Sequence, residues 1–407
     1  MSAYPAEATV VADRGARRHA DDTEGVHQAL SPPTGSGVAG GLRLDGARTR
    51  PGTTGATESP TAVLPAQCRT SVRQAPIRSR RGGNGAAYDR RVDQRILLDE
   101  ATLQAWVTVA HEARWYDRVL ATSADPGAGS NFDLIDAHYR YELASSWHRS
   151  YLTAALEHLL LWAEMVAPLK FHPDQVTIHR LRPTYTLARA ALESAAHAVW
   201  LSGGDSAEEC ARRHLRLIRW DYDEHAKSVT DPEQKSRIRS MDNRLLSRVS
   251  EHLSEADLRP PGLLDVLRWA AEVIGVSPAD VERVWRAASG ATHGKYWPNL
   301  ALQHVVPVEE YAPGQLRTVS VPDPAGMTEA LELAVQMTGL GVARHVQFGG
   351  LELQPVLDEA RRWLATVVPF RDDADPEVIA HLQRGEEGPD SRAPRRGRPT
   401  SDGGYRP

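Results

Sequence analysis

Cysteine is nearly absent from this sequence, which has only Cys68 and Cys210 in 407 residues. Two cysteines cannot form the disulfide framework of a small secreted protein, and they do not supply the four closely spaced thiolates of a structural zinc site. The scarcity of cysteine therefore favours a reducing compartment. We expect a cytoplasmic protein.

Long hydrophobic runs are also missing. The most apolar stretch, LTAALEHLLLWAEMVA, is interrupted by Glu157, His158 and Glu164, so it is too short and too charged to cross a bilayer. Arg17 and Arg18 are not followed by the apolar segment that a secretory or twin-arginine signal requires. We expect no membrane partner.

Aromatic residues are almost lacking from the first 92 positions, where only Tyr4 and Tyr88 occur. This segment contains clusters of Pro, Gly, Ser and Thr, such as SPPTGSGVAGG, and it buries too little apolar surface to offset its chain entropy. We therefore predict a disordered arm over residues 1–92, a helical domain over 93–370, and a disordered tail over 371–407.

Several catalytic and metal-binding motifs are absent. Only His27, in the aromatic-poor N-terminal segment, has a Glu three residues before it, and none of the 16 histidines has a His four residues away, which argues against di-iron and helical zinc sites in the helical region. A G-x-G-x-x-G match, Gly35 to Gly40, follows Ser31-Pro-Pro-Thr rather than a strand, so it does not indicate a dinucleotide site. We predict no metal and no cofactor.

Apolar residues recur at helical spacing from Leu98 onward, which predicts an all-α fold, a multi-helix bundle of about eight helices. Residues 300–322 alternate apolar and polar side chains around Pro313-Gly314, which predicts a short hairpin or extended excursion. The predicted helices are 99–121, 133–167, 183–201, 325–346 and 353–367, with others beginning near Asp205, Asp231, Pro261 and Ser277.

The helix expected over 183–201 is apolar on nearly every side, which indicates a central place in the bundle. Its polar stripe consists of Arg189, Glu193 and His197, beside Trp200. Because buried charges must be paired, this stripe is either a structural ion pair or the support of an active-site wall.

The stretch R-A-A-S-G-A-T-H-G-K-Y-W-P from Arg286 has two interpretations. If the helix stops at Gly290, that glycine takes a positive φ and His293 begins the exit from the helix. If the helix continues, Arg286 and His293 lie two turns apart on one face, with Ser289 between them. A His can then exchange the proton of a ribose 2′-hydroxyl while an Arg holds the phosphate.

The segment from Arg286 to His293, followed by G-K-Y, resembles the motif of HEPN domains, in which His follows Arg after four to six residues. Together with R-A-A-L-E-S-A-A-H from Arg189, it is also similar to uncharacterised bacterial proteins with an Arg-x-x-x-Glu helix and a later Ser-x-x-x-His. The resemblance spans residues 183–300. It implies a helical fold, RNA as partner, Arg286 and His293 as catalytic residues without a metal, and a homodimer. The alternative is a non-catalytic scaffold or protein-binding module.

Lysine is scarce, with 4 Lys against 44 Arg. This bias is typical of very GC-rich bacterial genomes such as those of actinobacteria, so the abundance of arginine says little about nucleic acid. The tail residues Arg396, Gly397, Arg398 and Pro399 form one AT-hook-like core, which can lie in a narrow minor groove. It has no second copy, so DNA binding by the tail is the lesser alternative.

Overall fold

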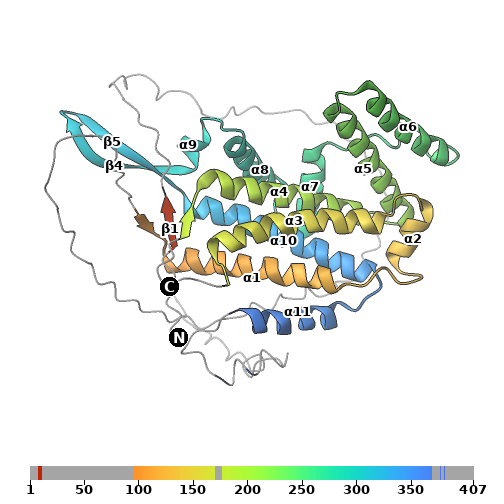
Figure 1. The fold of residues 1–407 in the computed structure, drawn as a ribbon, viewed down its shortest axis with the longest axis horizontal. Helices are drawn as coiled ribbons and strands as arrows, with labels where there is room; N and C mark the ends of the chain where they lie inside the picture. Colours follow the sequence, from red (N-terminus) through yellow and green to blue (C-terminus); the bar gives the residue numbers. More distant parts are fainter. Residues whose placement is uncertain (1–7, 12–94, 170–176, 369–375, 377–379, 381–407) are drawn as a thin grey trace, which may run out of the picture. The chain divides into compact units, whose positions relative to one another are not determined.

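The computed structural model describes residues 8–11, 95–169, 177–368, 376 and 380 (Figure 1). Eleven helices lie within these residues, and the predicted all-α class is confirmed. Their bounds are Glu100–Thr122 (α1), Asn131–His138 (α2), Ala144–Val166 (α3), Leu181–Leu201 (α4), Ala207–Ser228 (α5), Pro232–Val249 (α6), Leu263–Ile274 (α7), Pro278–Thr292 (α8), Pro298–Ala301 (α9), Pro324–Phe348 (α10) and Leu353–Val367 (α11).

The core is built around α4, which contacts α3, α7, α8 and α10 (Figure 1). Its small residues, such as Ala191 and Ala195, are fully buried and let the neighbouring helices approach closely. Trp106 from α1, Trp162 from α3 and Tyr185 from α4 fill the same cluster and are also buried. The expectation that this helix is central is thus confirmed, and its polar residues have few routes to water.

Two helices begin at the residues predicted to cap them, and a third begins one residue later than predicted. Asp231 and Ser277 cap α6 and α8 as predicted, by accepting hydrogen bonds from backbone amides of the first turn. The cap of α5 is Ser206 rather than Asp205, because the Ser206 hydroxyl accepts from the Glu209 amide at 3.1 Å. The sequence contains both candidates side by side, so spacing alone could not choose between them.

The single helix predicted over residues 133–167 is wrong. The structure divides it into α2 and α3, joined by residues 139–143. The Asp136 carboxylate accepts from the Ser145 amide at 3.1 Å and from its hydroxyl at 2.5 Å, so the end of α2 supplies partners for the start of α3. The connection is held by α5, because Tyr222 donates to the Glu142 carboxylate and a ring nitrogen of His214 lies 2.8 Å from the Glu142 carbonyl oxygen.

The predicted hairpin is confirmed as β4 (Gln303–Ala312) and β5 (Gln315–Pro322), which pair antiparallel around Gly314 at φ 73°. A second, three-stranded sheet was not expected. Its strands are β1 (Ala8–Val11), β2 (Arg95–Leu97) and β3 (Thr177–His179), and β1 lies between the other two. β1 lies in the segment 1–92 for which the sequence predicts a disordered arm, and these four residues are the part of that arm that the structure describes. The rest of the arm and nearly all of the predicted tail lie outside the described residues.

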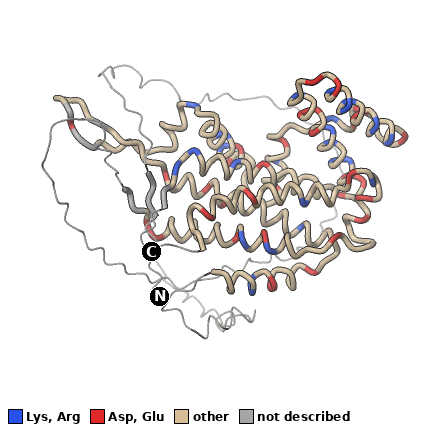
Figure 2. The backbone as a smooth tube through the Cα atoms, viewed as in Figure 1, with Lys and Arg blue, Asp and Glu red and all other residues tan. Residues whose placement is uncertain are grey.

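In the part of the chain that the structure describes, no helix combines the length and the apolar character needed to span a bilayer. Charged residues of both signs are interspersed along α5 and α6 (Figure 2).

Candidate functional site

The first half of α4 and the segment from α8 to α9 run antiparallel and are joined by polar contacts. The Arg182 guanidinium donates to the Asn299 side-chain oxygen at 3.1 Å, and the Thr186 and Thr292 hydroxyls lie 3.1 Å apart. These contacts fix the end of α8 on α4. The stretch that the sequence singled out therefore has a defined place against the central helix.

One turn further along α4, Arg189 and Glu193 form an ion pair. Nε of Arg189 donates to Oε1 of Glu193 at 2.6 Å, and Nε1 of Trp285 donates to the same oxygen at 2.6 Å. The guanidinium also lies 5.5 Å from the centre of the Trp285 ring. The two charged side chains are only 18% and 23% exposed, so the pair is screened less than a surface ion pair. Glu193 therefore holds the Arg189 guanidinium in one orientation.

The other end of the Arg189 guanidinium contacts His293. Nη1 of Arg189 lies 3.2 Å from Nε2 of His293, and the His293 side chain is exposed to solvent. Arginine has no acceptor atom, so Nε2 of His293 is the acceptor and the neutral ring carries its proton on Nδ1. The structure thus links Glu193, Arg189 and His293 in a chain that ends at the surface.

The end of α8 differs from the first of the two interpretations of this stretch. Gly290 is helical, and the helix continues to Thr292. The left-handed residue is Gly294, at φ 65°, with the Gly294 amide bonded to the Ala291 carbonyl and the Lys295 amide bonded to the Gly290 carbonyl. These two hydrogen bonds form a Schellman motif, with His293 as the last residue before the glycine. Arg286 and His293 consequently share one face of α8, two turns apart.

Within the described residues, no hydrogen bond joins Arg286 to His293. Arg286 is 57% exposed, and its Nε donates to Oε1 of Glu282 at 2.8 Å. Arg268 donates to the other oxygen of Glu282 at 2.9 Å. The hydrogen bond from Arg268, and then the one from Arg286, lower the pKa of Glu282. A phosphate at Arg286 would have to compete with an ionised carboxylate.

His197 and Ser289 lie beside the hydrogen-bonded residues Glu193, Arg189 and His293 rather than at the exposed end formed by His293. Nδ1 of His197 lies 2.7 Å from the Glu193 carbonyl oxygen, and its ring stacks on Tyr151 with centroids 5.2 Å apart. Burial lowers the pKa of His197, so its neutral form is favoured. Ser289 contributes its carbonyl oxygen to the His293 amide at 3.0 Å. Both residues are therefore placed as supports.

The two segments that meet at the site are rich in arginine and are bordered by Glu193 and Glu282. Residues 177–192 and 283–308 contain no Asp or Glu, although the whole sequence has 53 acidic residues and a net charge of −5. The two segments carry Arg180, Arg182, Arg189, Arg283, Arg286 and Lys295. Their antiparallel contact brings these cations to one part of the molecule, where Arg189, Arg283 and Arg286 pair with Glu193, Glu329 and Glu282.

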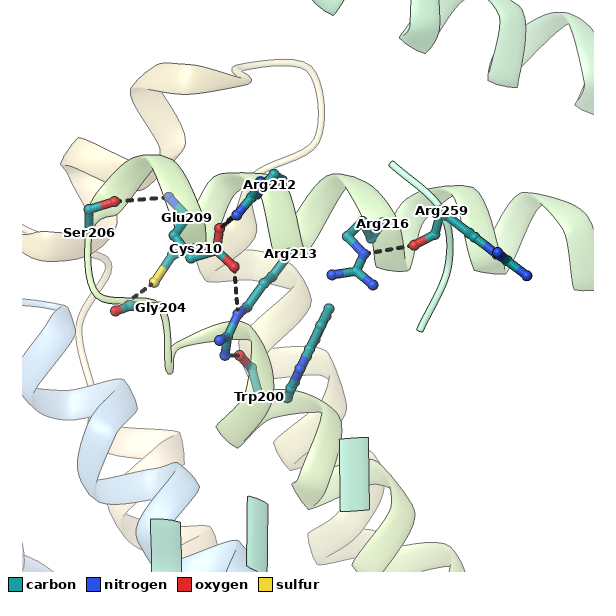
Figure 3. Close-up of polar contacts among 9 residues, drawn as sticks. All are labelled: Trp200, Gly204, Ser206, Glu209, Cys210, Arg212, Arg213, Arg216 and Arg259. Atoms are coloured by element: carbon teal, nitrogen blue, oxygen red, sulfur yellow. Dashed lines mark hydrogen bonds and ion pairs between the residues drawn. The ribbon is translucent and has the colours of Figure 1, made fainter. Parts of the chain in front are cut away.

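The arginines of α5 at positions 212, 213 and 216 are paired within the protein (Figure 3). Arg212 and Arg213 both donate to Glu209, and Nε of Arg216 donates to the Arg259 carbonyl at 2.7 Å. Arg213 also lies 4.4 Å from the centre of the Trp269 ring. These arginines act as structural contacts between α5 and its neighbours.

Two further predictions concern metals and DNA. Within the described ranges, no three His, Cys, Asp or Glu side chains gather closely enough to hold a metal ion, and the metal-free site remains a prediction. The AT-hook-like residues 396–399 lie outside the described residues.

Trp285 is a neighbour of this site that the sequence did not reveal. Its indole donates to Glu193 across 92 positions of sequence, and only its place directly before Arg286 could have drawn attention to it.

No family model, curated protein or solved structure matches this chain. Its function must therefore be argued from the geometry of the site.

Proposed function

We propose that this chain binds RNA and cleaves it without a metal ion, at the site formed by Arg189, Glu193 and His293. The observation that carries the proposal is the exposed His293, whose Nε2 is paired with the guanidinium of a partly buried, carboxylate-anchored arginine. A general base within reach of a phosphate-binding cation is the minimum that RNA transesterification requires.

The reaction would begin when Arg189 turns its Nη1 from His293 to a phosphate oxygen. This frees Nε2 of His293 to take the proton of the adjacent 2′-hydroxyl, whose oxygen then bonds to phosphorus. The bond from phosphorus to O5′ breaks, and His293 returns the proton to O5′. The products are a 2′,3′-cyclic phosphate and a 5′-hydroxyl, and Arg189 stabilises the negative charge that develops on the phosphate.

Arg286 would provide a second phosphate contact two turns away on α8, in exchange for its bond with Glu282. We further propose that the protein is a HEPN-like bacterial protein of actinobacterial type. It would act as a homodimer in the cytoplasm, in a defence or stress response. The basic residues of the two segments that meet at the site support an RNA ligand, because phosphate contacts supply most of the affinity for nucleic acid.

The second candidate is a non-catalytic scaffold or protein-binding module. It is favoured by the saturation of Oε1 of Glu193, which accepts from both Arg189 and Trp285 as a structural ion pair would. In this case His293 would serve only to satisfy Arg189.

The two candidates are separated by an RNA cleavage assay on the full chain in the presence of EDTA. His293→Ala should reduce the cleavage rate by about 10²- to 10⁴-fold, the range for loss of a general acid or base. The control is His225→Ala, because His225 is an exposed histidine on α5 outside the site. If wild type and both variants are equally inactive, and His293→Ala lowers the melting temperature, the scaffold is correct and the ribonuclease is not.

A further inference from the structure

The turn after His293 exposes aromatic side chains. Tyr296 is 53% exposed and Trp297 is 44% exposed, and both follow directly on the Schellman motif at the end of α8. Exposed aromatic rings beside cations are the usual platform for unpaired bases, because every base presents a π-face for stacking.

Trp297 is held against Gly290. A Cβ added at Gly290 would lie 2.8 Å from Cζ2 of Trp297 and 3.0 Å from its Cε2, so the indole lies directly on the backbone of α8. The absence of a side chain at Gly290 is what allows this approach. One part of the ring is therefore buried on the helix, and the rest remains accessible.

The position of Gly290 places this ring between the two residues that the sequence selected. Arg286, Gly290 and His293 occupy positions i, i+4 and i+7 of α8, which form one stripe along the helix. The Trp297 ring covers the middle of that stripe. A strand laid along it would meet a cation, an aromatic face and an imidazole in order.

The charge around the ring suits a phosphate backbone. Residues 283–308 lack acidic side chains, and the exposed Lys295 lies two residues before Trp297. Arg182 fixes the far side of the turn by its bond to Asn299. The turn thus combines a fixed aromatic ring with positive charge.

We propose that Trp297 stacks on an unpaired base of single-stranded RNA and so positions the RNA strand at His293. The inference rests on the proposed function, and it deepens that function by naming the substrate class. Duplex RNA keeps its bases stacked on one another, so it has no face to offer Trp297. The site should therefore prefer single strands to duplexes of the same sequence.

Binding is measured on the full chain with a fluorescein-labelled single-stranded 2′-O-methyl oligoribonucleotide, by fluorescence anisotropy. The methyl group removes the nucleophile, so affinity is obtained whether or not the protein cleaves RNA. Trp297→Phe keeps an aromatic face, whereas Trp297→Leu keeps only an apolar cover for Gly290. The matched control is Tyr141→Leu, because Tyr141 is 65% exposed and lies between α2 and α3, outside the site.

We expect Trp297→Leu to bind about tenfold more weakly, in line with the loss of one stacked base, while Trp297→Phe and Tyr141→Leu bind nearly as wild type does. The duplex should bind wild type more weakly than the single strand. Equal affinity of wild type and a folded Trp297→Leu variant would overturn the stacking role. Failure of wild type to bind the single strand at all would overturn it together with the proposed RNA ligand.

A second measurement uses wild type alone, in case the variants do not fold. Oxidative footprinting read by mass spectrometry should show that the single-stranded oligonucleotide protects Trp297, and an unprotected Trp297 at saturating oligonucleotide would contradict the inference. Binding and protection without cleavage of unmodified RNA would retain the inference and refute the ribonuclease. Cleavage without protection would do the reverse.

Discussion

Glu193 is the residue on which the candidate site depends. Its Oε1 accepts two hydrogen bonds of 2.6 Å, from Arg189 on the same helix and from Trp285, and the bond from Trp285 connects α4 with α8. A charged acceptor strengthens such bonds, and partial burial keeps water from replacing them. Arg189 can hold His293 only because Glu193 holds Arg189.

Replacement of Glu193 by Gln tests this dependence. The amide oxygen can still accept a hydrogen bond, but the partly buried Arg189 charge loses its counterion. We expect the free energy of unfolding to fall by about 1–3 kcal/mol, measured by urea denaturation. Glu208→Gln is the control, because Glu208 is exposed on α5 and should cause a change below about 0.5 kcal/mol. Equal effects of the two substitutions would contradict the central role of Glu193.

At the scale of elements, the end of α8 decides how the site is presented. The helix passes through Gly290 and ends in a Schellman motif at Gly294, so His293 lies at the last helical turn with its side chain in solvent. If the helix ended at Gly290 instead, His293 would lie in the exit turn and would not share a face with Arg286.

Gly294→Ala should weaken this helix end. Gly294 has φ 65°, and a side chain in the left-handed region costs about 1–2 kcal/mol. We expect a loss of about 1 kcal/mol in the free energy of unfolding, and a smaller loss for Gly294→Asn, since Asn tolerates this conformation. Gly127→Ala is the control, because a Cβ there would meet only the Gly349 carbonyl oxygen at 3.7 Å. A Gly294→Ala variant as stable as wild type would argue against the Schellman motif.

Local patterns predicted these elements unevenly. Apolar periodicity located α1, α4, α10 and α11 to within about three residues, because their buried faces follow the helical repeat. The same periodicity failed at the break between α2 and α3, where the contacts that hold residues 139–143 come from α5. Gly290 and Gly294 are both plausible helix stops in sequence, and the approach of Trp297 to Gly290 distinguishes them only in three dimensions.

The sequence predicted only some of the contacts that form the candidate site. The Arg189 and Glu193 pair is a local i, i+4 contact and could be predicted. The contact between Arg189 and His293 joins residues 104 positions apart, and no spacing rule reports it. The donor from Trp285 was missed for the same reason.

For the whole molecule, the buried histidines predict sensitivity to acid. Nδ1 of His148 and Nδ1 of His345 lie 3.2 Å apart in the core, and Nε2 of His148 is buried without a hydrogen-bond partner in the described part of the chain. Burial lowers the pKa of His345 to about 4 and lowers that of His148 well below its ordinary value. The nearby Arg149 and Arg344 act in the same direction.

These pKa shifts determine in which direction the free energy of unfolding changes with pH. In the unfolded chain both histidines bind protons near pH 6.5, whereas in the folded protein they remain neutral. Their contribution to stability is therefore fully present above pH 6.5 and is lost as the pH falls toward 4. The loss is at most about 1.4 kcal/mol per pH unit for each proton. His345→Gln should make the fall in unfolding free energy less steep. Parallel profiles for wild type and His345→Gln would show that the pair does not titrate on unfolding.

In the proposed reaction, His293 removes the proton of a ribose 2′-hydroxyl while Arg189 holds the adjacent phosphate. Analysis of the RNA ends that the full chain produces in EDTA tests this step. We expect 2′,3′-cyclic phosphate and 5′-hydroxyl ends, and neither should form from RNA methylated at the 2′ positions or with the His293→Ala variant. Products with a 5′-phosphate, or cleavage that persists in His293→Ala, would contradict it.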